Sequence, residues 1–137
     1  MSKRLGKRSD QNIHDRSDAL IEFASNLTFQ DIPSDVVVHA KRVILDTIGC
    51  SMAGLHTPEG KSVIAAVKDC AKGDEATIWG DGGKVSAIGA ALANGTTAHS
   101  LDSDPLGAGG AVFLGSTAVP TAFAVAEKLR NVSGKDL

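Results

Sequence analysis

The segment from Val85 to about Ser100 limits the fold more than any other part of the chain, because it combines a helical pattern with very small side chains. Its small residues are Gly89, Ala90, Ala91, Ala93, Gly95 and Ala98. A glycine inside a helix costs about 1 kcal/mol relative to alanine, and close packing against neighbouring helices offsets that cost. We therefore predict a helix over 85–100 that is buried among other helices.

Further helices are predicted from capping residues and apolar spacing. They begin at Ser17 or Asp18, within Asp31-Ile-Pro33-Ser34-Asp35, at Thr57-Pro58 and at Ser116 or Thr117. The second ends at Gly54, the third before Lys72-Gly73 and the last at Arg130, with Pro120 in its first turn. The second helix is expected to bury one apolar stripe, formed by Val37, Ile44, Ile48 and Met52.

One short stretch departs from the helical pattern. The run Ala76-Thr-Ile-Trp79 is β-prone and is closed by the turn Gly80-Asp-Gly-Gly83, but it is too short to establish a sheet. The predicted fold class is therefore all-α, mainly helical, with one extended segment at 76–79. Residues 1–16 are expected to form a disordered polar tail, and residues 17–137 a single helical domain without an internal break.

Charge and hydropathy exclude two classes of partner. The net charge is −2 and the Lys and Arg residues are dispersed after the first few positions, which argues against nucleic-acid binding. No run of about twenty apolar residues and no secretory signal is present, so we expect no membrane partner and an intracellular, cytoplasmic protein. The basic start, with Lys3, Arg4, Lys7 and Arg8, leaves a mitochondrial targeting segment as the alternative.

The sequence predicts neither a cofactor nor a metal. Gly80-Asp-Gly-Gly83 lacks the Lys-Ser/Thr ending of a phosphate loop and the spacing of a dinucleotide-binding turn. Cys50 and Cys70 stand alone, twenty residues apart, and match neither a zinc pattern nor a redox pair. We expect both to be buried, reduced, structural thiols.

Candidate catalytic residues lie where the small-residue helix is expected to end. Ile88, Leu92, Gly95, His99 and Asp102 are spaced by three or four residues, so a buried stripe on one face is expected to lead into a His and an Asp. Proton transfer next to a carboxylate needs a group that accepts a proton near neutral pH, and His99, Asp102 and Asp104 are the candidates. The alternative is that Asp102 merely ends the helix and His99 makes an ordinary hydrogen bond.

A set of short motifs resembles one known family in both order and spacing. The motifs are Asp31-Ile-Pro-Ser-Asp35, Ile44-Leu-Asp-Thr-Ile-Gly49 with Ala53-Gly54, Ala93-Asn-Gly95, His99-Ser-Leu-Asp102, and Val119-Pro120 with Ala126-Glu127. Together they resemble the N-terminal part of the 2-methylcitrate dehydratase (MmgE/PrpD) family, which also includes cis-aconitate decarboxylases. The resemblance covers nearly all of the chain after its first fifteen or so residues.

The resemblance implies a large helical domain with a smaller lid domain, a homodimer, and metal-free, cofactor-free lyase chemistry on small tricarboxylates such as 2-methylcitrate or cis-aconitate. Members of the family are much longer than this chain. The chain is therefore expected to form an incomplete helical bundle, a truncated N-terminal domain that is inactive alone. The rival hypothesis is a catalytically dead helical scaffold or dimerisation module.

The resemblance also carries over to single residues. His99 and Asp102 match the helix-end His and the first Asp of the family's H-x-x-D-x-D-D-T-like motif, and Asp104 matches the next Asp. The match then fails, because Pro105 and Leu106 stand where a further Asp and a Thr or His are usual. Phe113 or a neighbour stands where the family has a catalytic His, which favours the rival hypothesis.

Overall fold

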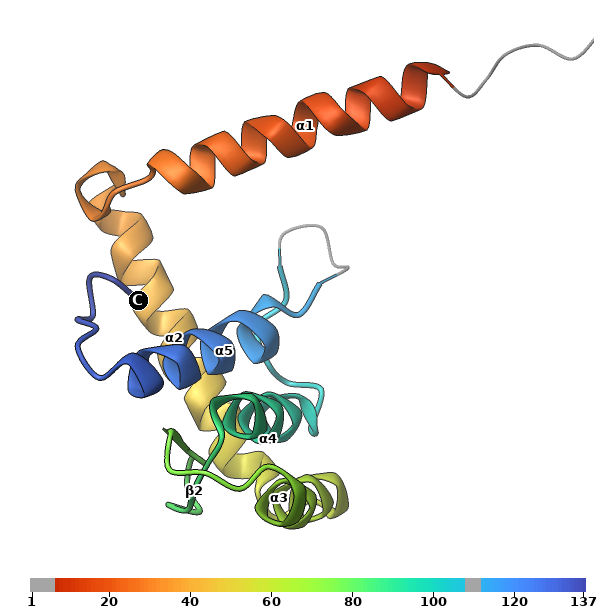
Figure 1. Cartoon of the computed structure of the whole chain (residues 1–137), viewed down its shortest axis with the longest axis vertical. Helices are drawn as coiled ribbons and strands as arrows, with labels where there is room; N and C mark the ends of the chain where they lie inside the picture. The colour runs from red at the N-terminus through yellow and green to blue at the C-terminus, as the bar shows by residue number, and fades with distance from the viewer. Residues whose placement is uncertain (1–6, 108–111) are drawn as a thin grey trace, which may run out of the picture. The chain divides into compact units, whose positions relative to one another are not determined.

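A computed structural model describes residues 7–107 and 112–137, and the side chains from residue 16 onward within them. The chain divides into two compact units, Met1–Ser34 and Asp35–Leu137. The described residues form five α-helices, one short 3-10 helix and two short strands, so the predicted, mainly helical fold class is confirmed (Figure 1). Within these residues, no helix is long and apolar enough to cross a membrane.

The first unit contains helix α1, Lys7–Asn26, and the 3-10 helix η1, Phe29–Asp31. Helix α1 begins well before the predicted start at Ser17 or Asp18, because residues 7–16 are polar and carry no apolar spacing to indicate a helix. Residues 1–6 lie outside the described residues, so a disordered tail there stays a prediction. Asp31 caps η1: its Oδ2 accepts hydrogen bonds from the Thr28 backbone N–H at 3.0 Å and hydroxyl at 2.6 Å.

Helix α2, Ser34–Gly54, ends where the sequence predicts, but its most deeply buried residues lie outside the predicted stripe. The predicted apolar stripe is only partly buried: Val37, Ile44 and Ile48 are half-buried, and Met52 is exposed. The buried residues are Thr47, Ser51 and Gly54. These small residues let α2 approach the helix that carries Thr97. Hydropathy thus indicated the half-buried stripe of α2, but not the small residues at which the backbones approach most closely.

Two contacts define that close approach between α2 and the next helices. The Ser51 and Thr97 hydroxyls are hydrogen-bonded at 2.7 Å. A Cβ atom added to Gly54 would collide with the carbonyl oxygen of Thr97. Glycine is therefore required at position 54 by the neighbouring backbone.

Helix α3, Pro58–Cys70, begins as the sequence predicts. The Thr57 hydroxyl accepts a hydrogen bond from the Gly60 N–H at 3.0 Å, and Pro58 occupies the first turn, where its missing N–H costs nothing. Val67 is buried on this helix. Cys70 is exposed at its end, and Cys50 on α2 is half-buried, so the predicted burial of both thiols is wrong.

The extended segment at 76–79 is part of a two-stranded hairpin. Strand β1, Ala76–Thr77, pairs antiparallel with β2, Lys84–Val85, with Ala76 opposite Val85. The sequence predicted β1 without its partner, because Val85 also fitted a helical pattern. Gly80 and Gly82 have φ values of +73° and +78°, which explains why glycines form the turn.

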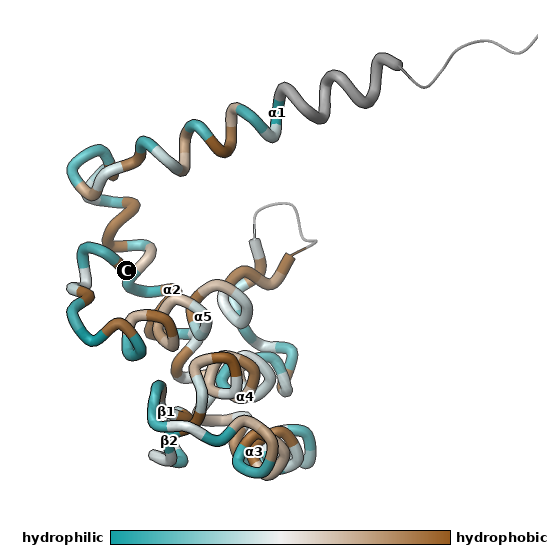
Figure 2. Tube along the Cα trace, viewed as in Figure 1, coloured by the Kyte–Doolittle hydropathy of each residue, from teal (hydrophilic) through white to brown (hydrophobic). Residues whose placement is uncertain are grey.

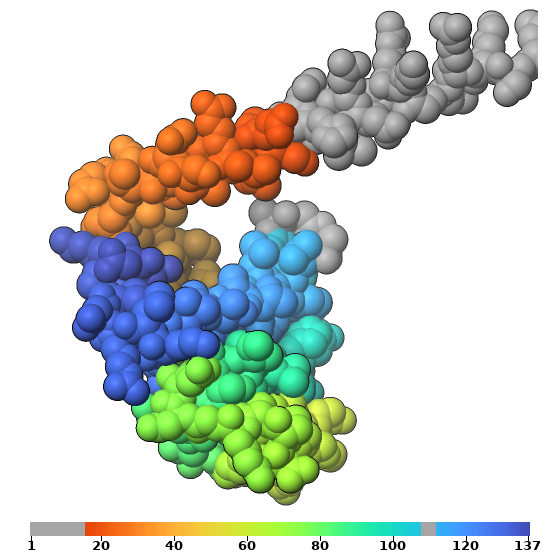
Figure 3. Space-filling view, in the orientation of Figure 1, coloured from red at the N-terminus to blue at the C-terminus, as the bar shows by residue number. Residues whose placement is uncertain are grey.

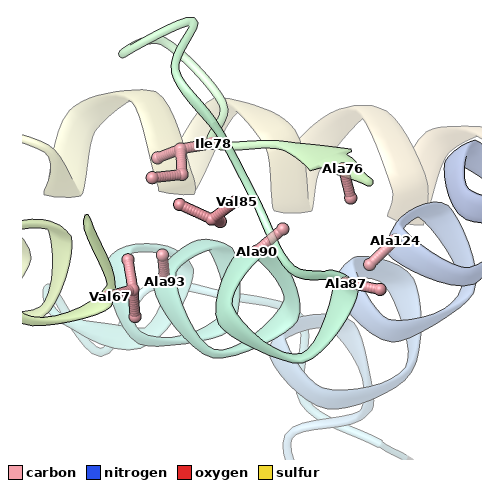
Figure 4. Close-up of a cluster of buried hydrophobic side chains, with 8 residues drawn as sticks. All are labelled: Val67, Ala76, Ile78, Val85, Ala87, Ala90, Ala93 and Ala124. Carbon is pink, nitrogen blue, oxygen red and sulfur yellow. The ribbon is translucent and has the colours of Figure 1, made fainter. Parts of the chain in front are cut away.

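Helix α4, Ala87–His99, starts after Ser86, whose hydroxyl accepts a hydrogen bond from the Gly89 N–H at 3.2 Å. One face of α4 packs into the hydrophobic core that Figure 4 shows between the hairpin, α3 and α5. The core residues are Val67, Ala76, Ile78, Val85, Ala87, Ala90, Ala93 and Ala124. Asn94 joins this face to the hairpin, because its side chain bonds the Trp79 N–H and the Thr77 carbonyl, each at 2.9 Å.

Helix α5, Leu114–Leu129, places Pro120 in its second turn, not in the first turn as predicted. Proline has no N–H, so Pro120 leaves the Ser116 carbonyl without its usual helical donor. Gly95 of α4 lies against that carbonyl, since an added Cβ would come within 2.7 Å of the Ser116 oxygen. The space-filling view shows α3, α4 and α5 packed against one another (Figure 3). Helices α4 and α5 are thus in direct backbone contact.

Candidate active site

The candidate site lies where α4 ends and the following loop returns to α5. His99 is the last residue of α4, and its Nδ1 atom lies 2.8 Å from Oδ1 of Asp104. The Asp104 side chain is completely buried, whereas the His99 side chain is 48% exposed. The pair therefore connects the interior of the domain to its surface.

The charge of Asp104 decides which nitrogen of His99 carries the proton. Burial acts to raise the pKa of Asp104, but the side chains of Ser116 and His99, together with the local backbone, outweigh it and hold the pKa below the ordinary value of 3.8. Asp104 is thus a carboxylate at neutral pH and can only accept hydrogen bonds. Nδ1 of His99 must therefore be the donor, which leaves Nε2 free for other chemistry.

The second oxygen of Asp104 has no comparable partner. Its Oδ2 is buried and accepts no hydrogen bond of ordinary geometry from any residue in 7–107 or 112–137. Ser116, buried in the first turn of α5, is the neighbour whose side chain contributes most to lowering the pKa of Asp104. The carboxylate is thus held firmly at one oxygen only.

His99 lines an open groove of about 570 Å³ between α4 and α5. The groove residues are Glu59, Ala91, Leu92, Gly95, Thr96, His99, Ser100, Ser116, Thr117 and Thr121. Hydroxyl groups and one imidazole are available in it for hydrogen bonding. None of these lining residues is a Lys or Arg, so this part of the chain does not neutralise a multiply charged anion.

Asp102, the other predicted catalytic residue, lies apart from the pair. Its backbone is left-handed, with a φ of +51°, and its N–H donates to the His99 carbonyl at 2.9 Å. The side chain is exposed and makes no hydrogen bond or ion pair with the rest of the described chain. The helical spacing on which we grouped His99 with Asp102 ends at His99, so the structure brings His99 together with Asp104 and not with Asp102.

The residues that depart from the family motif lie around the same loop. The ring of Phe113 contacts that of His99 edge-on, with centroids 4.5 Å apart and planes at 61°. Leu106 is exposed, and Pro105 lies close to Gly115 at the start of α5. Phe113 thus covers one side of the imidazole with a ring that cannot exchange protons.

The apolar stripe that leads to His99 is not buried within this chain, contrary to the prediction. Ile88 is 83% and Leu92 is 56% exposed. Figure 2 shows apolar residues along α2, α4 and α5. The buried residues of α4 lie mainly on the opposite face, among them Ala90, Ala93 and Thr97. Gly95 is the member of the stripe against which α5 packs.

Sequence reasoning missed Ser116 and the hydroxyl residues of α5 that share the groove with His99. Thr117 and Thr121 point to the same groove, seventeen or more positions beyond His99 in the sequence. A local motif search cannot detect such a set, because the fold and not the spacing brings α5 beside α4. Within the described ranges, no three His, Cys, Asp or Glu side chains gather in a way that could hold a metal ion.

Comparison with known proteins places the chain among lyase relatives. Residues 18–137 match the family model described as the MmgE/PrpD N-terminal domain. Cis-aconitate decarboxylase of Aspergillus terreus is 30% identical over 122 residues, which cover 86% of this chain and 25% of that protein. The cis-aconitate decarboxylase-like protein oryM of Aspergillus oryzae is 28% identical over 108 residues, covering 79% of this chain and 22% of that protein. The chain thus spans about a quarter of the length of these relatives. No solved structure was found to match it.

Proposed function

The chain belongs to the MmgE/PrpD family, whose N-terminal domain it carries, and on this basis we propose that it is the helical part of a lyase for small tricarboxylates. The relatives named above support decarboxylation of cis-aconitate as the first candidate reaction. Dehydration of a 2-methylcitrate-like hydroxy acid is the second. Both reactions need a group that moves a proton at a carbon next to a carboxylate.

His99 is the proposed proton-transfer group. In a dehydration, Nε2 would accept the proton alpha to a carboxylate, and the electron pair left on carbon would form the carbon–carbon double bond as the hydroxyl group departs. The leaving hydroxide would take up the proton from the charged His99 and depart as water. In a decarboxylation, the bond to the leaving carboxylate would break, carbon dioxide would depart, and the electron pair left on carbon would take a proton from His99 in its charged form. The imidazole serves both directions because its ordinary pKa lies near neutral pH.

One observation carries the proposal: the half-exposed imidazole of His99 is held at Nδ1 by the completely buried carboxylate of Asp104, 2.8 Å away. The carboxylate fixes both the ring orientation and the tautomer, so Nε2 lies on the outer edge of the ring, at the groove. Asp102 is exposed in the adjoining turn, and its catalytic role stays a prediction.

The groove does not complete a tricarboxylate site by itself. A substrate with three carboxylates needs several positioned cationic or hydrogen-bonding groups, and the groove offers hydroxyls, one imidazole and the acidic Glu59. We propose that cationic groups come from parts of the longer protein, or from a homodimer partner, and that residues 1–137 alone do not turn over either substrate. No cofactor enters this proposal.

The test is an assay of the complete gene product with cis-aconitate and with 2-methylcitrate, following release of carbon dioxide or of the unsaturated acid. His99→Gln is expected to lower kcat by roughly 10²- to 10⁴-fold, the usual contribution of a general acid or base. Asp104→Asn should also lower kcat, whereas Ser103→Ala, in the same loop, should change it little. Full activity of His99→Gln together with loss of activity in Asp102→Asn would show that the role assignment is wrong.

The contact between Phe113 and His99 favours a second candidate, a helical scaffold without catalysis. An edge-on aromatic ring at 4.5 Å limits access to one side of the imidazole. This scaffold would act through a binding surface, such as a dimer contact. Turnover by the complete product that depends on His99 would exclude it, and the absence of turnover in every variant, with association intact, would support it.

A further inference from the structure

One oxygen of the buried Asp104 carboxylate lacks a hydrogen-bond donor within the described residues. Its side chain is completely buried, Oδ1 is paired with His99, and Oδ2 accepts no ordinary hydrogen bond within the described chain. A buried charged oxygen without a donor loses the hydrogen bonds that water would give it in the unfolded chain, and such groups are rare in native proteins. A donor for Oδ2 is therefore to be expected in the working protein.

Ser116 is the hydroxyl best placed to be that donor. It is buried in the first turn of α5 and also lines the groove beside His99. Its backbone is held on the side of α4 by the close approach of Gly95 to its carbonyl oxygen. The preceding residue, Gly115, packs against Pro105 of the loop, since a Cβ atom added to Gly115 would lie 3.0 Å from Cδ of Pro105. The backbone of Ser116 is thus fixed beside the loop that carries Asp104, and its side chain is the neighbour that lowers the pKa of Asp104 most.

We propose that Ser116 is a positioning residue for His99: its hydroxyl donates a hydrogen bond to Oδ2 of Asp104, and the carboxylate thereby holds the proton of His99 on Nδ1. We call this chain of hydrogen bonds, from Ser116 through Asp104 to His99, the relay. Its role in turnover rests on the proposed function, but its existence does not. Both predicted and missed residues join in it: His99 and Asp104 were expected from the sequence, and Ser116 was not.

The relay gives the groove a defined chemistry. With Asp104 charged and held at both oxygens, Nδ1 of His99 stays a donor and Nε2 stays available as a base. Without Ser116, the carboxylate is free to turn or to take up a proton more readily, and both tautomers of His99 become populated. Nε2 would then carry the proton in part of the molecules and could not accept another. Glu59 lines the groove and Asp102 lies in the adjoining turn, but within the described residues neither side chain forms a hydrogen bond or ion pair with the side chains of His99 and Asp104.

The test reads the tautomer and the titration directly in the full chain. Nitrogen NMR of the His99 ring reports the fraction protonated at Nδ1, and carbon NMR of the Asp104 carboxyl reports its titration midpoint. Ser116→Ala is expected to lower the Nδ1–H fraction of neutral His99 and to raise the Asp104 midpoint. Thr117→Val is the matched control: it lines the same groove, but its hydroxyl bonds the Phe113 and Leu114 carbonyls of its own helix, so neither signal should change.

The same measurements separate a relay from mere packing. If Ser116→Ala lowers the melting temperature while tautomer and midpoint stay as in the Thr117→Val control, the proposal is wrong. In an Asp104→Asn background, Ser116→Ala should not change the His99 tautomer further, and an additional change of similar size would also contradict the relay. If Ser116→Ala does not fold, a crystal structure of the unchanged chain decides, because a water molecule instead of Ser116 Oγ at Asp104 Oδ2 would overturn the proposal. If the NMR measurements confirm the relay but the complete gene product has no lyase activity, the proposed function is wrong and the present inference still holds.

Discussion

On α4, Ala90 and Ala93 are completely buried, whereas Ile88, two residues before Ala90, is 83% exposed. Helix α2 repeats the contrast, with Ser51 and Gly54 buried and Leu45 exposed. In both helices the buried face is small and partly polar, and the exposed face carries the large apolar side chains. The difference teaches that close backbone approach, made possible by small side chains, determines which face of these helices is most deeply buried in the described part of the chain.

The largest effect is expected from truncating the same residue type in the two environments. Ile78→Ala removes the largest completely buried side chain and should lower the free energy of unfolding by about 2–5 kcal/mol. Ile88→Ala on the exposed face should change it by less than about 0.5 kcal/mol. Urea denaturation of both variants tests the contrast. Equal losses would mean that the exposed face of α4 is covered in solution.

That contrast also explains what the sequence could and could not predict. Capping residues located the start of α3, because Thr57 and Pro58 act on the backbone locally. Hydropathy did not predict the most deeply buried residues, because Gly54 and Gly95 act through backbones that are distant in the sequence. The interior position of Pro120 was missed because the helix was predicted to begin at Ser116 or Thr117, whereas α5 begins at Leu114.

The candidate site divides in a similar way. His99 and Asp104 were predicted from residue type and family resemblance, and the structure brings them together at 2.8 Å. Asp102 was grouped with His99 on an assumed continuation of the helix, which a left-handed residue interrupts. The proximity of Ser116 to this pair could not be predicted, because the sequence of residues 100–116 does not indicate the path by which the loop leads back to α4.

A smaller effect should follow from adding one methyl group to each of two glycines of α2. Gly54→Ala places a Cβ against the Thr97 carbonyl and should lower the free energy of unfolding by about 1–3 kcal/mol, the usual cost of overpacking. Gly49→Ala meets nothing within 4 Å and should raise it by up to about 1 kcal/mol, through helix propensity alone. Thermal unfolding followed by circular dichroism measures both. A Gly54→Ala variant as stable as the parent would show that α2 does not pack against Thr97.

The smallest effect concerns Asp104, which lies in the loop after α4 and is paired with His99 at the end of that helix. The pKa of Asp104 is lowered in the folded chain, so its charge contributes stability at pH values above the ordinary pKa of 3.8, and this contribution is lost as the pH falls through the lower, folded pKa. The free energy of unfolding of the parent should therefore fall more steeply in acid than that of Asp104→Asn. Chemical denaturation between about pH 2 and 6 measures both slopes, and identical slopes would contradict a lowered pKa.

The backbone contact between Gly95 and Ser116 holds α4 and α5 together directly, so their packing does not depend on the loop that connects them. Because doubling the length of a flexible loop costs only about 0.6 kcal/mol in closure entropy, insertions or deletions between Pro105 and Phe113 are thermodynamically cheap. His99 and Ser116 would keep their separation through such changes. Changes in the length of this stretch are therefore expected to leave the packing of α4 against α5 in place.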